Sequence, residues 1–140
     1  MKHLTTVIVA VTLIVLTCVF IPRLTFAGFP GPNANMKQFA PGDKIEMHFD
    51  AQHPDQWWKN DFDANGDMIH MPIKHPILFK RNDHQTNPIT NSDNGFEYWR
   101  ENPVTHAVIW YVFFDDGTFL QFETAPNGFI CRPGVWQHRT

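Results

Sequence analysis

The residues whose types and spacing could perform chemistry lie mainly in one acidic segment, Asp61-Phe62-Asp63-Ala64-Asn65-Gly66-Asp67. Side-chain oxygens stand at alternate positions, as in the first half of a calcium-binding loop. Calcium is held by several oxygen ligands, and Gly66 allows the sharp turn that brings alternate side chains together. We therefore interpret this segment as a candidate calcium site that a more distant carboxylate would complete, with the ligands Asp61, Asp63, Asn65 and Asp67.

A simpler interpretation of the same segment remains. An EF-hand carries a bidentate Glu at its twelfth position, which is Pro72 here, and no helix–loop–helix pattern surrounds the loop. Asn65-Gly66 flanked by aspartates is also typical of a hairpin turn. The segment therefore predicts either a calcium loop of another type or a turn between two strands.

Large aromatic residues among polar neighbours form a second candidate site. Because adjacent residues on a strand face opposite ways, one ring of each neighbouring pair should be buried and the other exposed. Exposed rings beside polar groups can anchor a protein partner or stack on a sugar. We predict a binding surface for a protein, with carbohydrate as the alternative ligand, formed by Trp57, Trp58, Tyr98, Trp99 and Arg100.

Methionine and histidine residues are concentrated between positions 36 and 75. Thioether and imidazole groups together suit copper, although Met on a strand also serves as core filler. The residues concerned are Met36, Met47, Met68 and Met71, with His48, His53, His70 and His75. No G-x-S-x-G, H-E-x-x-H or phosphate-binding Gly loop occurs. The sequence names no catalytic residue and predicts a protein that is not an enzyme, with a hydrolase or a periplasmic copper protein as less favoured alternatives.

The first 27 residues predict export. Lys2 precedes the uncharged apolar run 4–21, and Thr25 and Ala27 suit signal-peptidase cleavage before Gly28. The run approaches the ~20 residues that span a bilayer, so a retained signal anchor is the alternative. Both interpretations place the domain outside the cytoplasm, periplasmic or secreted, with membrane contact only through residues 4–21.

The two cysteines do not predict a disulfide framework. Cys18 lies in the leader, so Cys131 is expected to be a buried unpaired thiol or, alternatively, to form an intermolecular disulfide.

The elements that must position these residues are predicted to be strands. After the leader (1–27) and a Pro- and Gly-rich extended arm (28–42), we expect one β-rich domain at 43–140. Apolar alternation and covered apolar runs predict strands at 43–49, 71–79, 105–114, 118–125 and 129–136. Pro72 and Pro76 confine the strand at 71–79 to an edge or break it. We also expect a long polar loop at 80–95 and a short helix at 96–102. In the strand at 118–125 we expect Leu120 and Phe122 to face inward and Gln121 and Glu123 to face outward. The fold class is therefore all-β, or α+β with one short helix: a small antiparallel sandwich or barrel ending in a three-stranded meander.

Composition narrows the function. The chain has 11 Lys and Arg against 14 Asp and Glu, too few clustered cations for nucleic-acid binding, and its 13 Phe and 5 Trp require a packed core. We predict an exported, non-enzymatic protein that binds a protein partner in the cell envelope or outside, such as an inhibitor, an immunity-type protein or an accessory subunit. The alternative is a calcium-dependent ligand- or carbohydrate-binding module that uses the loop at 61–67.

Overall fold

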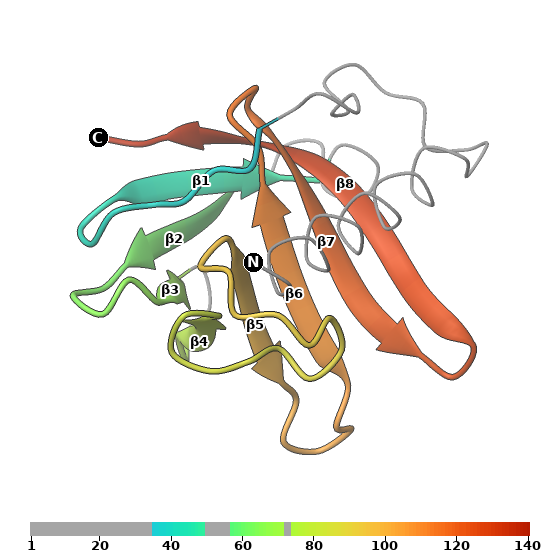
Figure 1. The fold of residues 1–140 in the computed structure, drawn as a ribbon. Helices are drawn as coiled ribbons and strands as arrows, with labels where there is room; N and C mark the ends of the chain where they lie inside the picture. The colour runs from blue at the N-terminus through green and yellow to red at the C-terminus, as the bar shows by residue number, and fades with distance from the viewer. Residues whose placement is uncertain (1–34, 50–56, 72–73) are drawn as a thin grey trace.

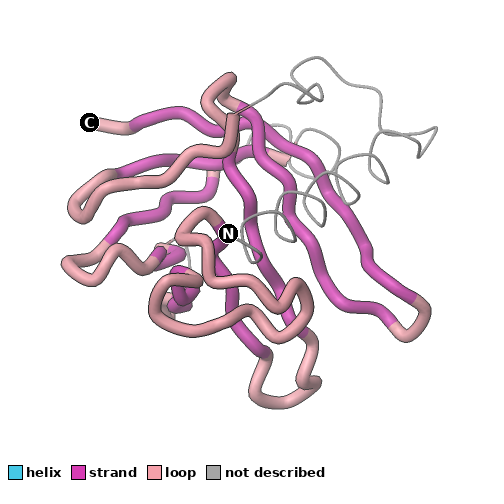
Figure 2. Tube along the Cα trace, viewed as in Figure 1, coloured by secondary structure: helices cyan, strands magenta, loops and turns pink. Residues whose placement is uncertain are grey.

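Eight antiparallel strands form a closed barrel in the computed structural model, which describes residues 35–49, 57–71 and 74–140 (Figure 1). The strands are β1 (Lys44–His48), β2 (Trp58–Phe62), β3 (Met68–His70), β4 (Ile77–Arg81), β5 (Glu97–Glu101), β6 (Val108–Phe113), β7 (Thr118–Ala125) and β8 (Gly128–His138). Each strand pairs with the next in sequence, and β8 pairs with β1 to close the wall. The described residues contain no helix (Figure 2), so the prediction of an antiparallel all-β fold is confirmed. A membrane-crossing helix is therefore also absent from this part of the chain.

The C-terminal meander is confirmed in β6, β7 and β8. Gly117 closes the turn between β6 and β7 with a positive φ of 87°, and its amide donates to the Phe114 carbonyl at 3.2 Å. A residue with a side chain would be strained at that φ, which explains the Asp-Asp-Gly sequence of the turn. The β7–β8 hairpin is paired from Thr118↔Val135 to Ala125↔Gly128, which makes it the longest ribbon of the described barrel.

Single elements differ from the predictions in three places. The expected helix at 96–102 is strand β5, because Tyr98 and Trp99 alternate across the barrel wall instead of following a helical period. The strand pattern expected from residue 71 to 79 begins only at Ile77, as strand β4, after β3 has ended at His70. This agrees with the expectation that Pro72 and Pro76 could break it. Strand β2 was not predicted, although the turn that follows it was.

The barrel interior is aromatic and is closed at one end by the chain that precedes β1. Phe39 is 1% exposed and stacks on Phe62 with ring centroids 4.4 Å apart. Its ring also meets Phe113 and Trp136 edge-on, and its amide donates to the Tyr98 hydroxyl at 3.0 Å. We call the end where β2, β4, β6 and β8 finish the Phe39 end, and the opposite end, where these strands begin, the polar end.

The orientation predicted for strand β7 is wrong. Gln121 pairs with Arg132 on the inward face, whereas Leu120 and Phe122 lie on the outer face of the wall. They join an outer apolar cluster that consists of Trp99, Val108, Trp110, Val112, Phe114, Leu120 and Phe122.

The long polar segment at 80–95 covers the outer face of β5 (Figure 2). Glu97 points into it and is fully buried. Its carboxylate accepts hydrogen bonds from Ser92 Oγ at 2.8 Å, from Thr90 Oγ1 at 3.0 Å and from Asn82 Nδ2. Burial raises the pKa of Glu97, and these three donors act in the opposite direction. The segment is thus tied to β5 by a buried polar anchor.

The expectation of an unpaired Cys131 thiol is wrong. Cys131 on β8 is disulfide-bonded, and its side chain packs against the outer apolar cluster.

Candidate functional site

Polar side chains line the inward face of β6, β7 and β8 toward the polar end. Tyr111, Gln121 and Arg132 occupy consecutive cross-strand positions. Arg132 Nη1 donates to Gln121 Oε1 at 3.0 Å and to Glu123 Oε2 at 3.1 Å. A guanidinium carries five N–H donors, so these two bonds engage one of its three nitrogens. We call Tyr111, Gln121, Glu123 and Arg132 the Arg132 cluster.

The charges at the polar end favour an acid once Arg100 is added to the Arg132 cluster, in which Arg132 and Glu123 balance. Arg100 on β5 alternates with inward-facing Tyr98 and pairs in register with Ile109, so it also faces the interior near this end. The two arginines outweigh the single carboxylate of Glu123. Burial raises the pKa of Tyr111, while Arg132 and Glu123 act on it in opposite directions, so its hydroxyl stays protonated. The wall therefore presents cationic and neutral donors.

A second polar pair lies on β2 and β3. His70 Nδ1 lies 2.7 Å from Asn60 Oδ1, and the His70 ring stacks on Trp58 with centroids 5.1 Å apart. Burial lowers the pKa of His70 to about 4, so the ring is neutral near pH 7. With Nδ1 donating to Asn60, Nε2 of His70 is left as an acceptor.

Asn60 carries an unsatisfied polar atom. The residue is 0% exposed, and its Nδ2 has no hydrogen-bond partner within the described part of the chain. If the amide were flipped, the oxygen would be unpaired instead, since one contact to His70 satisfies one of the two atoms. A buried unpaired donor costs about 1–3 kcal/mol, and such groups commonly mark a place where a ligand or water binds.

Apolar side chains complete the polar end. Four inward-facing residues of this end pack on the inner core but remain half-buried: Phe49, Trp58, Ile77 and Ile109. Inside the barrel, the ring centroids of Phe79 and Tyr111 lie 5.3 Å apart. Closed eight-stranded barrels have an interior that side chains fill or that holds one small ligand, and barrel mouths are common ligand sites.

Several aspartates of the acidic loop at 61–67 form hydrogen bonds or ion pairs with other groups of the protein. Asp63 Oδ1 accepts from the amides of Asn65 and Asp67, at 3.0 and 2.9 Å, as a turn requires. Asp61 forms an ion pair with Arg139, and Asp67, 3% exposed, accepts from the Arg81 amide at 2.8 Å. Among the residues that the structure describes, no three His, Cys, Asp or Glu side chains are grouped as metal ligands. The calcium assignment stays a prediction.

The five predicted binding residues are distributed over both sides of the wall. Trp57 is 37% exposed and stacks on His48, whereas Tyr98 is fully buried inside the barrel. Trp99 is 5% exposed under the segment at 80–95, where its Nε1 donates to the Gln85 carbonyl at 3.2 Å. Trp58 and Arg100 remain, and both face the polar end of the interior.

The copper hypothesis receives no support from its methionines in the described structure. Met47 and Met68 are fully buried in the inner core, Met36 packs beside Phe114, and Met71 is 40% exposed. His53 lies outside the described residues.

Sequence reasoning missed Asn60, Tyr111, Gln121 and Arg132 as site residues. The signal was present in the alternation of Gln121 and Glu123 with Leu120 and Phe122, but it was assigned to the wrong faces. Which face of β7 lies inside depends on barrel closure, and a single strand does not report it.

No family model and no curated protein matches the sequence. A solved crystal structure of a protein from Burkholderia vietnamiensis, described as "a putative beta-lactamase", matches with 17% sequence identity and a TM-score of 0.38, covering 74% of this chain and 99% of that one. A likeness of this size assigns no activity and no catalytic residue to this chain.

The expectation of a protein that acts by binding a protein partner through exposed rings is corrected. The burial of Tyr98 and Trp99 removes two rings from the surface on which that expectation depended.

Proposed function

We propose that this protein binds a small organic acid with an apolar body inside the polar end of its barrel. The observation that carries the proposal is the composition of that interior wall. Half-buried apolar side chains stand beside Arg132 and Arg100, and opposite them a buried amide has an unpaired polar atom.

Each part of the ligand has a counterpart on the wall. The carboxylate is placed at the Arg132 guanidinium, because charge-assisted hydrogen bonds to Arg are the strongest ones that these side chains can make. The apolar body lies along Trp58, Ile77 and Ile109. A second polar group on the ligand reaches Asn60 and His70 Nε2, which satisfies the buried amide.

Calorimetric titration with octanoate and with octanol tests the acid-binding step. We expect octanoate to bind to the full-length protein and octanol, which lacks the negative charge, to bind roughly tenfold or more weakly. In Arg132→Met the octanoate affinity should fall by the same factor, while octanol binding should not change.

Lys44→Met is the matched control, since it removes one exposed positive charge at the Phe39 end. It should leave octanoate affinity unchanged. An equal loss of octanoate affinity in both variants would show that net charge alone causes the loss, and would contradict a specific role of Arg132. An unaltered octanoate affinity in Arg132→Met would overturn the proposed site.

A further inference from the structure

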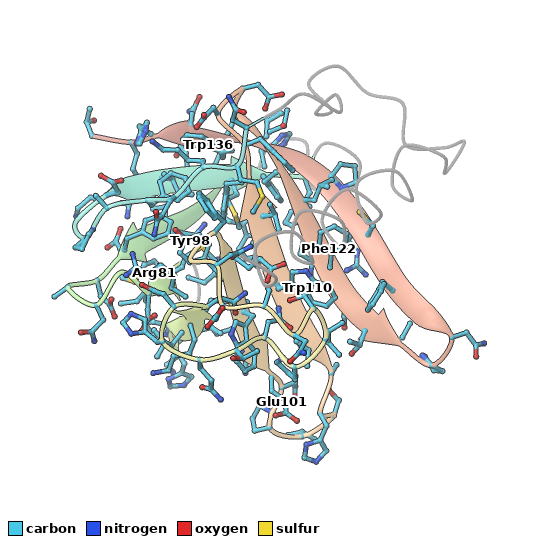
Figure 3. The ribbon with its side chains drawn as sticks, in the orientation of Figure 1. Arg81, Tyr98, Glu101, Trp110, Phe122 and Trp136 are labelled. Carbon is cyan, nitrogen blue, oxygen red and sulfur yellow. The ribbon has the colours of Figure 1, made fainter. Side chains whose placement is uncertain are left out.

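The outer face of β6–β8 is buried although it lies outside the barrel. Trp110 and Leu120 are 0% exposed and Phe122 is 2% exposed. Trp110 stacks on Phe122 with centroids 5.2 Å apart, and the two rings lie side by side on β6 and β7 (Figure 3). Contiguous apolar surface of this kind is seldom left in water. Another part of the chain must therefore cover it.

The described segments cover only the margins of this face. The segment at 80–95 lies over β5 through Gln85 and Glu97. Met36 and Cys131 are the half-buried apolar residues in the described ranges that pack against the cluster. Neither accounts for the full burial of Trp110 and Leu120 at its centre.

The disulfide of Cys131 identifies what lies there. Cys131 is the register partner of Phe122, so its sulfur is within the apolar face. It is disulfide-bonded, and the sequence contains one other cysteine, Cys18. Cys18 belongs to the apolar run 4–21, whose composition matches the face chemically.

The path of the chain makes this pairing possible. The described structure begins at the edge of the same face, where the Asn35 carbonyl accepts from the Asp115 amide at 2.8 Å and Met36 bridges to Phe114. The residues between Cys18 and Asn35 can span roughly 55 Å when extended. The four residue-to-residue steps from Thr118 to Phe122 along β7 cover only about 14 Å. The connection is therefore long enough.

We propose that residues 4–21 stay with the folded domain, pack on the outer apolar face of β6–β8 and are fixed there by a Cys18–Cys131 disulfide. Forming this bond removes two protons and two electrons from the two thiols. A protein disulfide oxidant accepts them by thiol–disulfide exchange and is reduced to its dithiol. The apolar run is thus part of the folded domain and does not span a bilayer.

Peptide mapping without reductant tests this pairing on the full chain exported to an oxidising compartment. We expect one cross-linked peptide pair that contains Cys18 and Cys131 and separates on reduction. A protein that begins at Gly28 with a free Cys131 would overturn the proposal. A Cys131–Cys131 dimer, or free thiols in a membrane-bound chain, would overturn it as well.

Thermal melting of cysteine variants gives a second readout. Cys18→Ser and Cys131→Ser should each lower the melting temperature by the same amount, and the double variant should lower it no further, because one bond is lost in all three. If Cys131→Ser destabilises and Cys18→Ser does not, the cysteines are not partners.

Discussion

Toward the polar end, the two faces of strands β6–β8 differ in chemistry. Toward the interior, the strands present Tyr111, Gln121 and Arg132, while on the outer face they present Trp110 and Phe122. In an isolated barrel the apolar face would be expected inside. The reversal shows that the outer face is itself a buried interface, and that the interior of this half is free to carry polar groups.

The outer surface of β4 is exposed, in contrast to the buried outer surface of β7. Leu78 lies on the outer face and is 42% exposed, whereas Leu120 on the outer face of β7 is fully buried. The same residue type therefore stands in water on one side of the barrel and under cover on the other. The cover is local to β5–β8.

The largest expected effect compares these two leucines. Leu120→Ala should reduce the free energy of unfolding by about 2–5 kcal/mol, as for a core leucine, because it leaves a cavity under the covering segment. Leu78→Ala should change it by about 0.5 kcal/mol or less. Urea unfolding of the full-length protein checks both values. Equal small effects would show that the outer face of β7 is not covered.

The next effect concerns the unpaired amide inside the barrel. The double variant Asn60→Leu/His70→Phe should be about 1–3 kcal/mol more stable, since it removes a buried polar atom that has no partner and keeps a ring against Trp58. The same variant should lose any preference for the ω-hydroxy derivative of octanoate over octanoate itself. Urea unfolding measures the change in stability, and calorimetric titration measures the ligand preference. A destabilised variant with unchanged ligand preference would contradict the assignment of Asn60 to the site.

The smallest expected effect is the pH dependence caused by His70. Burial lowers its folded-state pKa to about 4 from 6.5, so between these values the unfolded chain binds a proton that the folded protein does not. Stability should therefore fall as the pH drops from about 6.5 toward 4, and His70→Phe should reduce that loss. Urea midpoints measured near neutrality and near pH 5 check it. If stability falls equally with pH in the unmodified protein and in His70→Phe, then His70 accepts a proton in the folded state as readily as in the unfolded chain.

Much of the architecture was predictable from local signals. The alternation in 118–125 and the turn at Asp115-Asp116-Gly117 predicted the meander correctly, because turn chemistry and strand period are properties of neighbouring residues. The segment around Tyr98 and Trp99 was mistaken for a short helix. A five-residue strand that is buried on both faces shows little alternation of polar and apolar residues, so its sequence does not distinguish it from a helix.

The site could not be predicted in the same way. Asn60, His70 and Arg132 face the same interior only because the barrel closes, and closure is a long-range property. The inward and outward faces of β7 were exchanged for the same reason: the sequence predicts alternation but not which side another segment will cover. The Cys131 disulfide was missed because Cys18 was expected to be removed with the leader or held in the bilayer, which left Cys131 as an unpaired thiol or in an intermolecular disulfide.

An organic acid should enter the interior polar end of the barrel and leave the apolar outer face untouched. The most direct measurement is an NMR titration of the isotope-labelled protein with octanoate, following the indole N–H signals. Trp58 faces the interior and Trp110 faces outward, so each reports one side of the wall. We predict that the Trp58 signal shifts and saturates while the Trp110 signal stays in place. A saturating shift of Trp110 with Trp58 unmoved would place the acid on the outer face and contradict the account.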